Sequence, residues 1–189
     1  MKKDRKNIIL QSLAGMLEER TLSKITTAAL AEKSKITEAA LYRHFPSKRS
    51  IYAELFKFCD DAIFTKCNEL KKSKLSSKDK VKNAFIFFMI FVEKNKGFAR
   101  LLSREALSSD EQNVSDSVIQ FYERFELMLR QILKEDADNL TTQTGISAQL
   151  IVTAIEGNIS RYIRSKFKDS PSTYIENVWE LLSRSIFKS

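Results

Sequence analysis

The sequence contains little glycine, proline, cysteine and histidine, and each scarcity excludes a class of structure. Only 4 of its 189 residues are glycine and 2 are proline, which disfavours strands joined by tight turns and favours helices. The two cysteines, Cys59 and Cys67, would lie about 12 Å apart along one helix. That is too far for a disulfide, so we expect two reduced thiols. With one histidine and no Cys-x-x-Cys pattern, no metal site is expected.

Long apolar runs are also missing. None reaches the ~18 residues that a membrane-spanning helix needs, and the longest, from Ala84 to Val92, suits a buried helix. The N-terminal stretch MKKDRKNIILQSLAGMLEER is basic and then apolar, as a signal peptide is. However, Asp4, Glu18 and Glu19 and the helical spacing of its apolar residues argue against one. We therefore expect a cytoplasmic protein.

The sequence lacks the residue sets of the common catalytic sites. It has no Ser/His/Asp combination, no glycine-rich phosphate loop and no cluster of metal ligands. We therefore expect no enzymatic activity and no cofactor. A hydrolase that uses carboxylates alone is a minor alternative.

The net charge of +8 is unevenly distributed. Residues 1–50 hold 11 lysines and arginines against 5 acidic residues, a balance of +6, whereas residues 51–189 carry +2. Such an excess on one segment is typical of a protein that binds a polyanion such as DNA. A merely solvated basic face is the alternative that charge alone leaves open.

Residues 25–48, ITTAALAEKSKITEAALYRHFPSK, predict two short helices, a turn and the start of a third helix. Thr26 or Thr27 is placed to cap the first helix and Thr37 the second, because a side-chain oxygen there accepts a free N–H of the first turn. Pro46 ends the second helix. This pattern indicates a helix-turn-helix, whose second helix enters a DNA major groove.

The same segment resembles the DNA-binding domain of the TetR family of regulators. The resemblance rests on the pairs Ile25-Thr26, Leu30-Ala31, Ile36-Thr37, Leu41-Tyr42, His44-Phe45 and Ser47-Lys48. One departure is Lys35, at the turn position that usually holds glycine. A residue with a Cβ in a left-handed turn costs on the order of 1 kcal/mol, so we expect the turn to form with some strain.

The resemblance implies an all-α, TetR-like fold of two domains. Residues 1–48 would form a three-helix DNA-binding domain, and residues 49–189 a helical dimerisation and partner-binding domain. Besides the two short helices, the apolar spacing predicts about seven more. They cover residues 5–20, 48–70, 78–94, 98–107, a stretch ending near 135, 146–167 and 173–187. Gly97 is expected to end the fifth helix in a left-handed cap.

TetR-like docking assigns roles to eight residues of the motif. One set is expected to anchor phosphates and the other to face base edges. The phosphate set is Thr27, Tyr42, His44 and Lys48, and the base set is Thr37, Glu38, Ala39 and Arg43. The alternative for Arg43 is a phosphate contact or a solvent-facing charge, and for Tyr42 it is packing against the fourth helix.

The last two helices are predicted to form a dimer interface. Ala154 and Gly157 permit close approach of the eighth helix, and the ninth adds Trp179 and Leu182. In TetR-like proteins two such helices from each subunit make a four-helix bundle. A two-fold dimer then places its recognition helices about 34 Å apart on palindromic double-stranded DNA. The alternative is that these residues belong to the core of a single chain.

A narrower resemblance, to the nucleoid occlusion factors of this family, covers most of the chain. It rests on the strings ILQSLAGMLEE, ITTAALA, TEAALYRHFPSK, FYERFELMLRQIL and SRYIRSKFK. It implies a nucleoid-associated protein that, when bound to DNA, binds the division protein FtsZ and blocks assembly of the division ring. The implied contact surface, on the fourth and fifth helices, comprises Phe58, Lys66, Phe87, Ile90, Lys94 and Asn95.

The alternative function is that of a transcriptional repressor released from DNA by a small-molecule ligand. Many phenylalanines in the C-terminal part would then line a ligand pocket. Packing of the same rings into a core is the competing interpretation.

Overall fold

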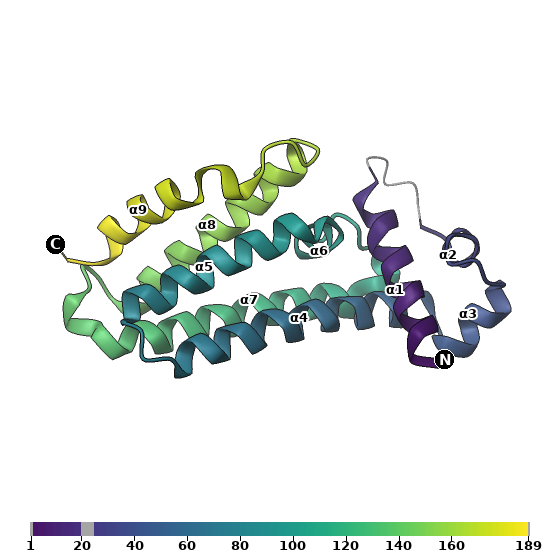
Figure 1. The fold of residues 1–189 in the computed structure, drawn as a ribbon, viewed down its shortest axis with the longest axis horizontal. Coiled ribbons are helices and arrows are strands. Elements are labelled where there is room, and N and C mark those ends of the chain that lie inside the picture. Colours follow the sequence, from purple (N-terminus) through teal and green to yellow (C-terminus); the bar gives the residue numbers. More distant parts are fainter. Residues whose placement is uncertain (1, 20–24, 189) are drawn as a thin grey trace. The chain divides into compact units, whose positions relative to one another are not determined.

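The computed structural model describes residues 2–19 and 25–188, and within these ranges the chain is helical, as the sequence predicts (Figure 1). An isolated antiparallel bridge joins Leu140 to Phe187. The α-helices are α1 (Lys2–Glu18), α2 (Thr27–Lys33), α3 (Glu38–His44), α4 (Lys48–Lys72), α5 (Ser77–Lys94), α6 (Lys96–Leu102), α7 (Gln112–Leu133), α8 (Thr144–Arg164) and α9 (Ile175–Ile186). Three short 3-10 segments are η1 (Ser109–Glu111), η2 (Lys134–Asn139) and η3 (Pro171–Tyr174).

These helices form two compact units. The first unit comprises Met1–Asp60 and Asn95–Val118, and the second comprises Asp61–Lys94 and Ile119–Ser189. α4 and α7 each contribute residues to both units. The division expected at residue 48 marks the start of α4, whereas the first unit continues along α4 and adds a segment distant in the sequence.

The core of the first unit lies where α1, α2 and α3 contact one another. α1 buries one apolar face, on which Ile9, Leu13 and Leu17 are at most 1% exposed. Leu30 of α2 and Leu41 of α3 are also completely buried. The apolar spacing of these three helices therefore produces the small three-helix core expected from the sequence.

The expectation that Gly97 ends α5 in a left-handed cap is wrong. Gly97 lies in the first turn of α6, and its φ is not positive. It is buried where α6 contacts α1. A Cβ added to it would lie 2.8 Å from the carbonyl oxygen of Ala14 and 3.2 Å from the Cα of that residue. Glycine is required here for the close approach of two backbones.

The core of the second unit is rich in phenylalanine. Phe85, Phe88, Phe121 and Phe125 are at most 1% exposed. The ring of Phe88 lies 5.0 Å from that of Phe125 and 5.7 Å from that of Phe121, measured between centroids. Such distances are those of aromatic rings in contact. These four rings therefore fill the core, which favours the core interpretation of the phenylalanines over the pocket interpretation.

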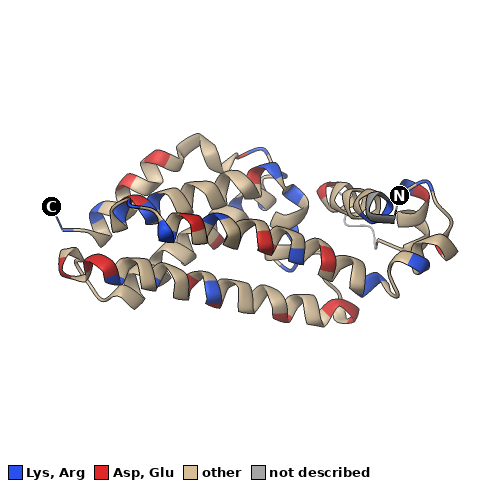
Figure 2. Ribbon diagram, turned by 60° about the horizontal axis from the view of Figure 1, so that its bottom comes forward, with Lys and Arg blue, Asp and Glu red and all other residues tan. Residues whose placement is uncertain are grey.

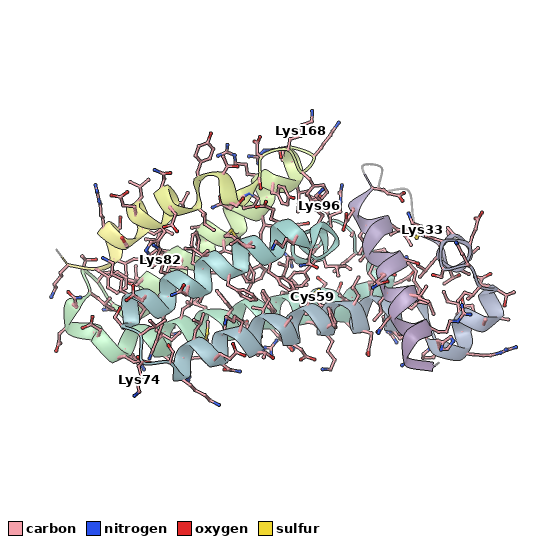
Figure 3. All side chains as sticks on the ribbon, viewed as in Figure 1. Lys33, Cys59, Lys74, Lys82, Lys96 and Lys168 are labelled. Carbon is pink, nitrogen blue, oxygen red and sulfur yellow. The ribbon has the colours of Figure 1, made fainter. Side chains whose placement is uncertain are left out.

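The two cysteines on α4 are free and buried, and Figure 3 labels Cys59. Burial raises the pKa of both thiols to about 12, and the charge of Asp60 adds to this effect at Cys59. A thiol that stays protonated is a poor nucleophile and metal ligand. Both residues therefore serve as small apolar side chains in the packing of α4.

Candidate nucleic-acid interface

The predicted caps of the helix-turn-helix are present. The side-chain oxygen of Thr26 accepts a hydrogen bond from the backbone N–H of Ala29 at 3.2 Å, and that of Thr37 accepts one from Ala40 at 3.2 Å. Each bond satisfies an N–H that the first helical turn leaves without a partner. Thr26 is therefore the cap of α2, and Thr37 is the cap of α3.

The turn between α2 and α3 has the conformation expected from its sequence. Lys35 has a φ of 54°, in the left-handed region. The next residue, Ile36, closes the turn by donating its N–H to the carbonyl oxygen of Ala31 at 3.0 Å. A lysine side chain thus occupies a position where glycine carries no steric penalty.

Lys35→Gly is expected to stabilise the protein by about 0.5–1 kcal/mol, because it removes the penalty for a Cβ at positive φ. The gain is partly offset by the greater freedom of glycine in the unfolded chain. Thermal and urea unfolding of the two proteins would measure the difference. Lys33→Gly, at the last residue of α2, is the comparison variant. It should be destabilising, because glycine lowers helix propensity and the ion pair between Lys33 and Glu19 is lost. A loss of stability in Lys35→Gly would show that Lys35 is not strained in the left-handed conformation.

α3 presents one exposed face and one buried face. The predicted base-facing residues Thr37, Glu38, Ala39 and Arg43 are all exposed, whereas Leu41 is buried. Of the predicted phosphate set, Tyr42 is 47% exposed and His44 is half-buried. Figure 2 shows basic residues on the turn before α3, on α3 itself and at the start of α4. An exposed polar face beside basic side chains is what contact with DNA requires.

Three of the predicted DNA-contacting residues bind one another, a contact that the sequence did not reveal. The hydroxyl of Tyr42 donates to Oγ1 of Thr27 at 3.4 Å, and the Thr27 hydroxyl donates to the carboxylate of Glu38. This chain of hydrogen bonds joins α2 to α3 at Glu38, the first residue of α3, and at Tyr42, about one turn later. It orients the recognition helix through residues that were expected to contact DNA.

Lys48 begins α4, directly after a reciprocal cap. The N–H of Ser50 donates to the Ser47 side chain and the N–H of Ser47 to the Ser50 side chain, each at 3.2 Å. The ammonium of Lys48 lies 3.1 Å from a carboxylate oxygen of Glu111 and 5.2 Å from the ring centroid of Tyr52. The Lys48 side chain is 22% exposed. Its position therefore depends on a residue that follows it by more than sixty positions.

Glu111, the partner of Lys48, is 1% exposed and was not among the residues expected to form the site. Burial opposes its ionisation, but hydrogen bonds from Ser108 and the charge of Lys48 outweigh burial and lower the pKa of Glu111. The pattern Ser108-x-x-Glu111 before an apolar helix is a capping box, and this signal could have identified it. Removing one partner of a buried ion pair typically costs about 3–5 kcal/mol, whereas an exposed pair contributes about 0.2–1 kcal/mol. We therefore expect Lys48 to stay with Glu111.

The first unit also contains an apolar groove. Its volume is about 340 Å³, and it lies between α1, α4 and the segment that begins α6. Its lining includes Phe58 and Asn95, two of the residues implied in partner binding, together with Leu10, Leu55 and Phe98. Phe58 is 66% exposed. An exposed aromatic side chain beside an apolar groove is typical of a site for a protein partner.

The other implied partner-binding residues belong to the second unit. Lys66 and Lys94 are exposed, and Lys66 pairs with Glu69 at 3.1 Å. Phe87 and Ile90 on α5 are half-buried. The structure thus brings Phe58 and Asn95 together at one groove and leaves both lysines accessible.

The dimer interface expected on α8 and α9 needs correction at two residues. Trp179 is 4% and Leu182 is 9% exposed in the single chain, and the Trp179 ring lies 6.1 Å from that of Phe85. Both side chains therefore belong to the core of the second unit. Ala154 is half-buried and Gly157 is exposed. The large apolar side chains that α8 and α9 leave exposed are Ile146, Leu150 and Leu181.

Two further properties follow from the described parts of the chain. Residues 2–19 and 25–188 form no helix with the length and hydropathy needed to cross a membrane. Among the same residues, no three His, Cys, Asp or Glu side chains are grouped as metal ligands would be.

Comparison with known proteins defines the class of protein. Residues 9–55 match the family described as bacterial regulatory proteins of the tetR family. Residues 77–187 match the SlmA-like family described as tetracyclin repressor-like, C-terminal domain.

Solved structures share the fold. Native NalD, the secondary repressor of the MexAB-OprM multidrug efflux pump in Pseudomonas aeruginosa, superposes with a TM-score of 0.80 at 16% identity. The match covers 100% of this chain and 98% of NalD. FadR from Bacillus subtilis in complex with stearoyl-CoA gives a TM-score of 0.77 at 17% identity, with coverage of 95% and 98%. The fold is that of a TetR-type helix-turn-helix regulator.

Relatives that are similar in sequence along nearly the whole chain identify the family within this class. The nucleoid occlusion factor SlmA of Vibrio campbellii is 36% identical over 98% of this chain and 97% of its own length. SlmA of Cronobacter sakazakii is 35% identical, with coverage of 98% and 96%. The chain therefore belongs to the SlmA family of nucleoid occlusion factors within the TetR regulators.

Proposed function

We propose that this nucleoid occlusion factor binds palindromic DNA as a homodimer and, in its DNA-bound form, binds FtsZ and blocks assembly of the division ring over the chromosome. It acts in the cytoplasm, at the nucleoid, and catalyses no reaction. The observation that carries the proposal is the exposed polar face of α3 in a chain similar to SlmA along nearly its whole length.

DNA binding is supported by the charge and geometry of the helix-turn-helix. The balance of +6 on residues 1–50 attracts phosphates and releases counterions when they bind. Thr37, Ala39 and Arg43 lie on the exposed face of α3, where a major groove would meet them. Binding should therefore weaken steeply with added salt.

FtsZ binding is supported by the groove beside Phe58. A peptide segment of FtsZ with an apolar side chain would fill the groove, and Phe58 would cover it. Lys94 is exposed and directly precedes Asn95 of the groove lining. Its charge suits a partner segment that also carries acidic residues. Because α4 begins at the DNA-binding motif and carries Phe58 two-fifths of the way along, DNA and FtsZ would act on the same helix.

Lys94→Glu is expected to weaken FtsZ binding about tenfold or more, because it places a like charge opposite the acidic segment. DNA affinity should be unchanged, since Lys94 is not among the residues expected to contact DNA or to position one that does. Sedimentation and light scattering of FtsZ, with DNA-bound protein added, would measure the effect. Lys66→Glu combined with Lys94→Glu should weaken binding further.

Lys74→Glu is the matched control, because Lys74 is an exposed lysine in the loop between α4 and α5 (Figure 3). It should leave FtsZ inhibition intact. The proposal fails if the wild-type protein on DNA leaves FtsZ assembly untouched. If a small molecule then releases the protein from DNA, the function is that of a ligand-responsive repressor.

A further inference from the structure

Glu111 is a buried carboxylate held from two sides. The backbone N–H of Ser108 donates to one of its oxygens at 2.9 Å, and the Ser108 hydroxyl donates to the same oxygen. The other oxygen lies 3.1 Å from the ammonium of Lys48. The Lys48 ammonium is the polar group that faces this oxygen. The charge at this oxygen is therefore balanced by Lys48.

Lys48 is held from two sides as well. Its ammonium lies between the Glu111 carboxylate and the face of the Tyr52 ring, 5.2 Å from the ring centroid. Tyr52 is 1% exposed, so this ring is itself fixed by packing. A lysine ammonium has three donors, and 22% of the Lys48 side chain remains exposed. One N–H of the Lys48 ammonium can thus bind Glu111 while another stays accessible to solvent at the start of α4.

We propose that Glu111 is a positioning residue for DNA binding, which holds the Lys48 ammonium where a DNA phosphate can accept from it. This inference rests on the proposed DNA binding. A free lysine chain must lose the freedom of several rotatable bonds when it contacts a phosphate. The contacts with Glu111 and Tyr52 already restrict the Lys48 side chain before DNA binds. The segment from Ser108 to Glu111 thereby sets part of the DNA affinity from outside the helix-turn-helix.

For Glu111→Gln, the loss of a negative charge and the loss of Lys48 positioning predict opposite changes in DNA affinity. Removing a negative charge near DNA strengthens binding if only the charge matters. Releasing Lys48 weakens binding if its position matters. One phosphate contact contributes roughly tenfold to affinity at low salt through counterion release, and about one unit to the salt slope. The sign of the change in affinity therefore decides between the two.

The experiment measures binding of the full chain to a fluorescein-labelled duplex of random sequence by anisotropy, over a range of KCl concentrations. Glu111→Gln and Lys48→Ala are each expected to weaken binding roughly 5–10-fold and to lower the salt slope by about one unit. The double variant should bind no more weakly than either single variant, because both remove the same contact.

Asp110→Asn is the matched control. It removes one negative charge from the same segment at an exposed residue next to Glu111, and it should leave binding unchanged or slightly tighter. Thermal unfolding checks that each variant is folded. If Glu111→Gln does not fold, Ser108→Ala keeps the charge and loosens the carboxylate, and a roughly 2–3-fold weaker affinity is expected when one of its hydrogen bonds is lost.

Wild-type affinity and salt slope in Glu111→Gln, or in Ser108→Ala where that variant replaces it, would overturn the inference. So would tighter binding. If the wild-type protein itself does not bind the duplex, the proposed function fails instead. The two failures are therefore distinguishable.

Discussion

Replacing Gly157 with tryptophan is expected to abolish the dimer and lower affinity for palindromic DNA by about 100-fold or more, because the second half-site is no longer bound by a linked subunit. Gly157 is exposed on α8, and a Cβ built on it meets no atom within 4 Å in the single chain. A side chain can therefore leave α8 at this position in the isolated subunit, and we expect the bulk of the indole to block close approach of a second one. Analytical ultracentrifugation and DNA titration would measure both effects.

Gly157→Ala is the matched variant for this prediction. A methyl group is small enough to keep the two helices close, and alanine favours the helix by up to about 1 kcal/mol. This variant should remain a dimer. Leu181→Glu tests the same surface from α9, where Leu181 is 67% exposed. If the tryptophan variant sediments as a dimer, the subunits meet elsewhere.

Gly97→Ala is expected to destabilise the protein by about 1–3 kcal/mol, the usual cost of forcing extra atoms into a packed site. Its Cβ would lie 2.8 Å from the carbonyl oxygen of Ala14, and the contacting atoms belong largely to backbone rather than to a flexible side chain. α1 and α6 would have to move apart. Differential scanning calorimetry should record a lower Tm. FtsZ affinity should fall too, because Gly97 lines the groove.

Gly15→Ala provides the comparison for this prediction, since Gly15 lies inside α1 and a Cβ there meets nothing within 4 Å. It should be neutral or stabilising by about 0.5–1 kcal/mol, as expected for alanine in a helix interior. Equal stability of the two variants would show that α6 tolerates the methyl group.

Local chemistry in the sequence determined the helices and the turn of the DNA-binding motif. Thr26 and Thr37 cap their helices by hydrogen bonds that span three residues, and Lys35 adopts the left-handed conformation its place in the motif demands. Apolar spacing likewise indicated α1 and α4 to within a few residues. Each of these features depends on neighbours in the sequence, so the sequence alone was enough.

The tertiary structure decided which side chains are buried or paired and which remain exposed. Trp179 and Leu182 have the same spacing whether they face a core or a partner, and only the packing of α9 against α5, α8 and η3 places them inside. Gly97 meets Ala14, and Lys48 meets Glu111, across separations for which local pattern contains no signal of pairing. The periodicity of a helix specifies its faces but not what each face contacts. The sequence therefore determined the elements and the motif, and the packing of distant segments determined the groove and the position of Lys48.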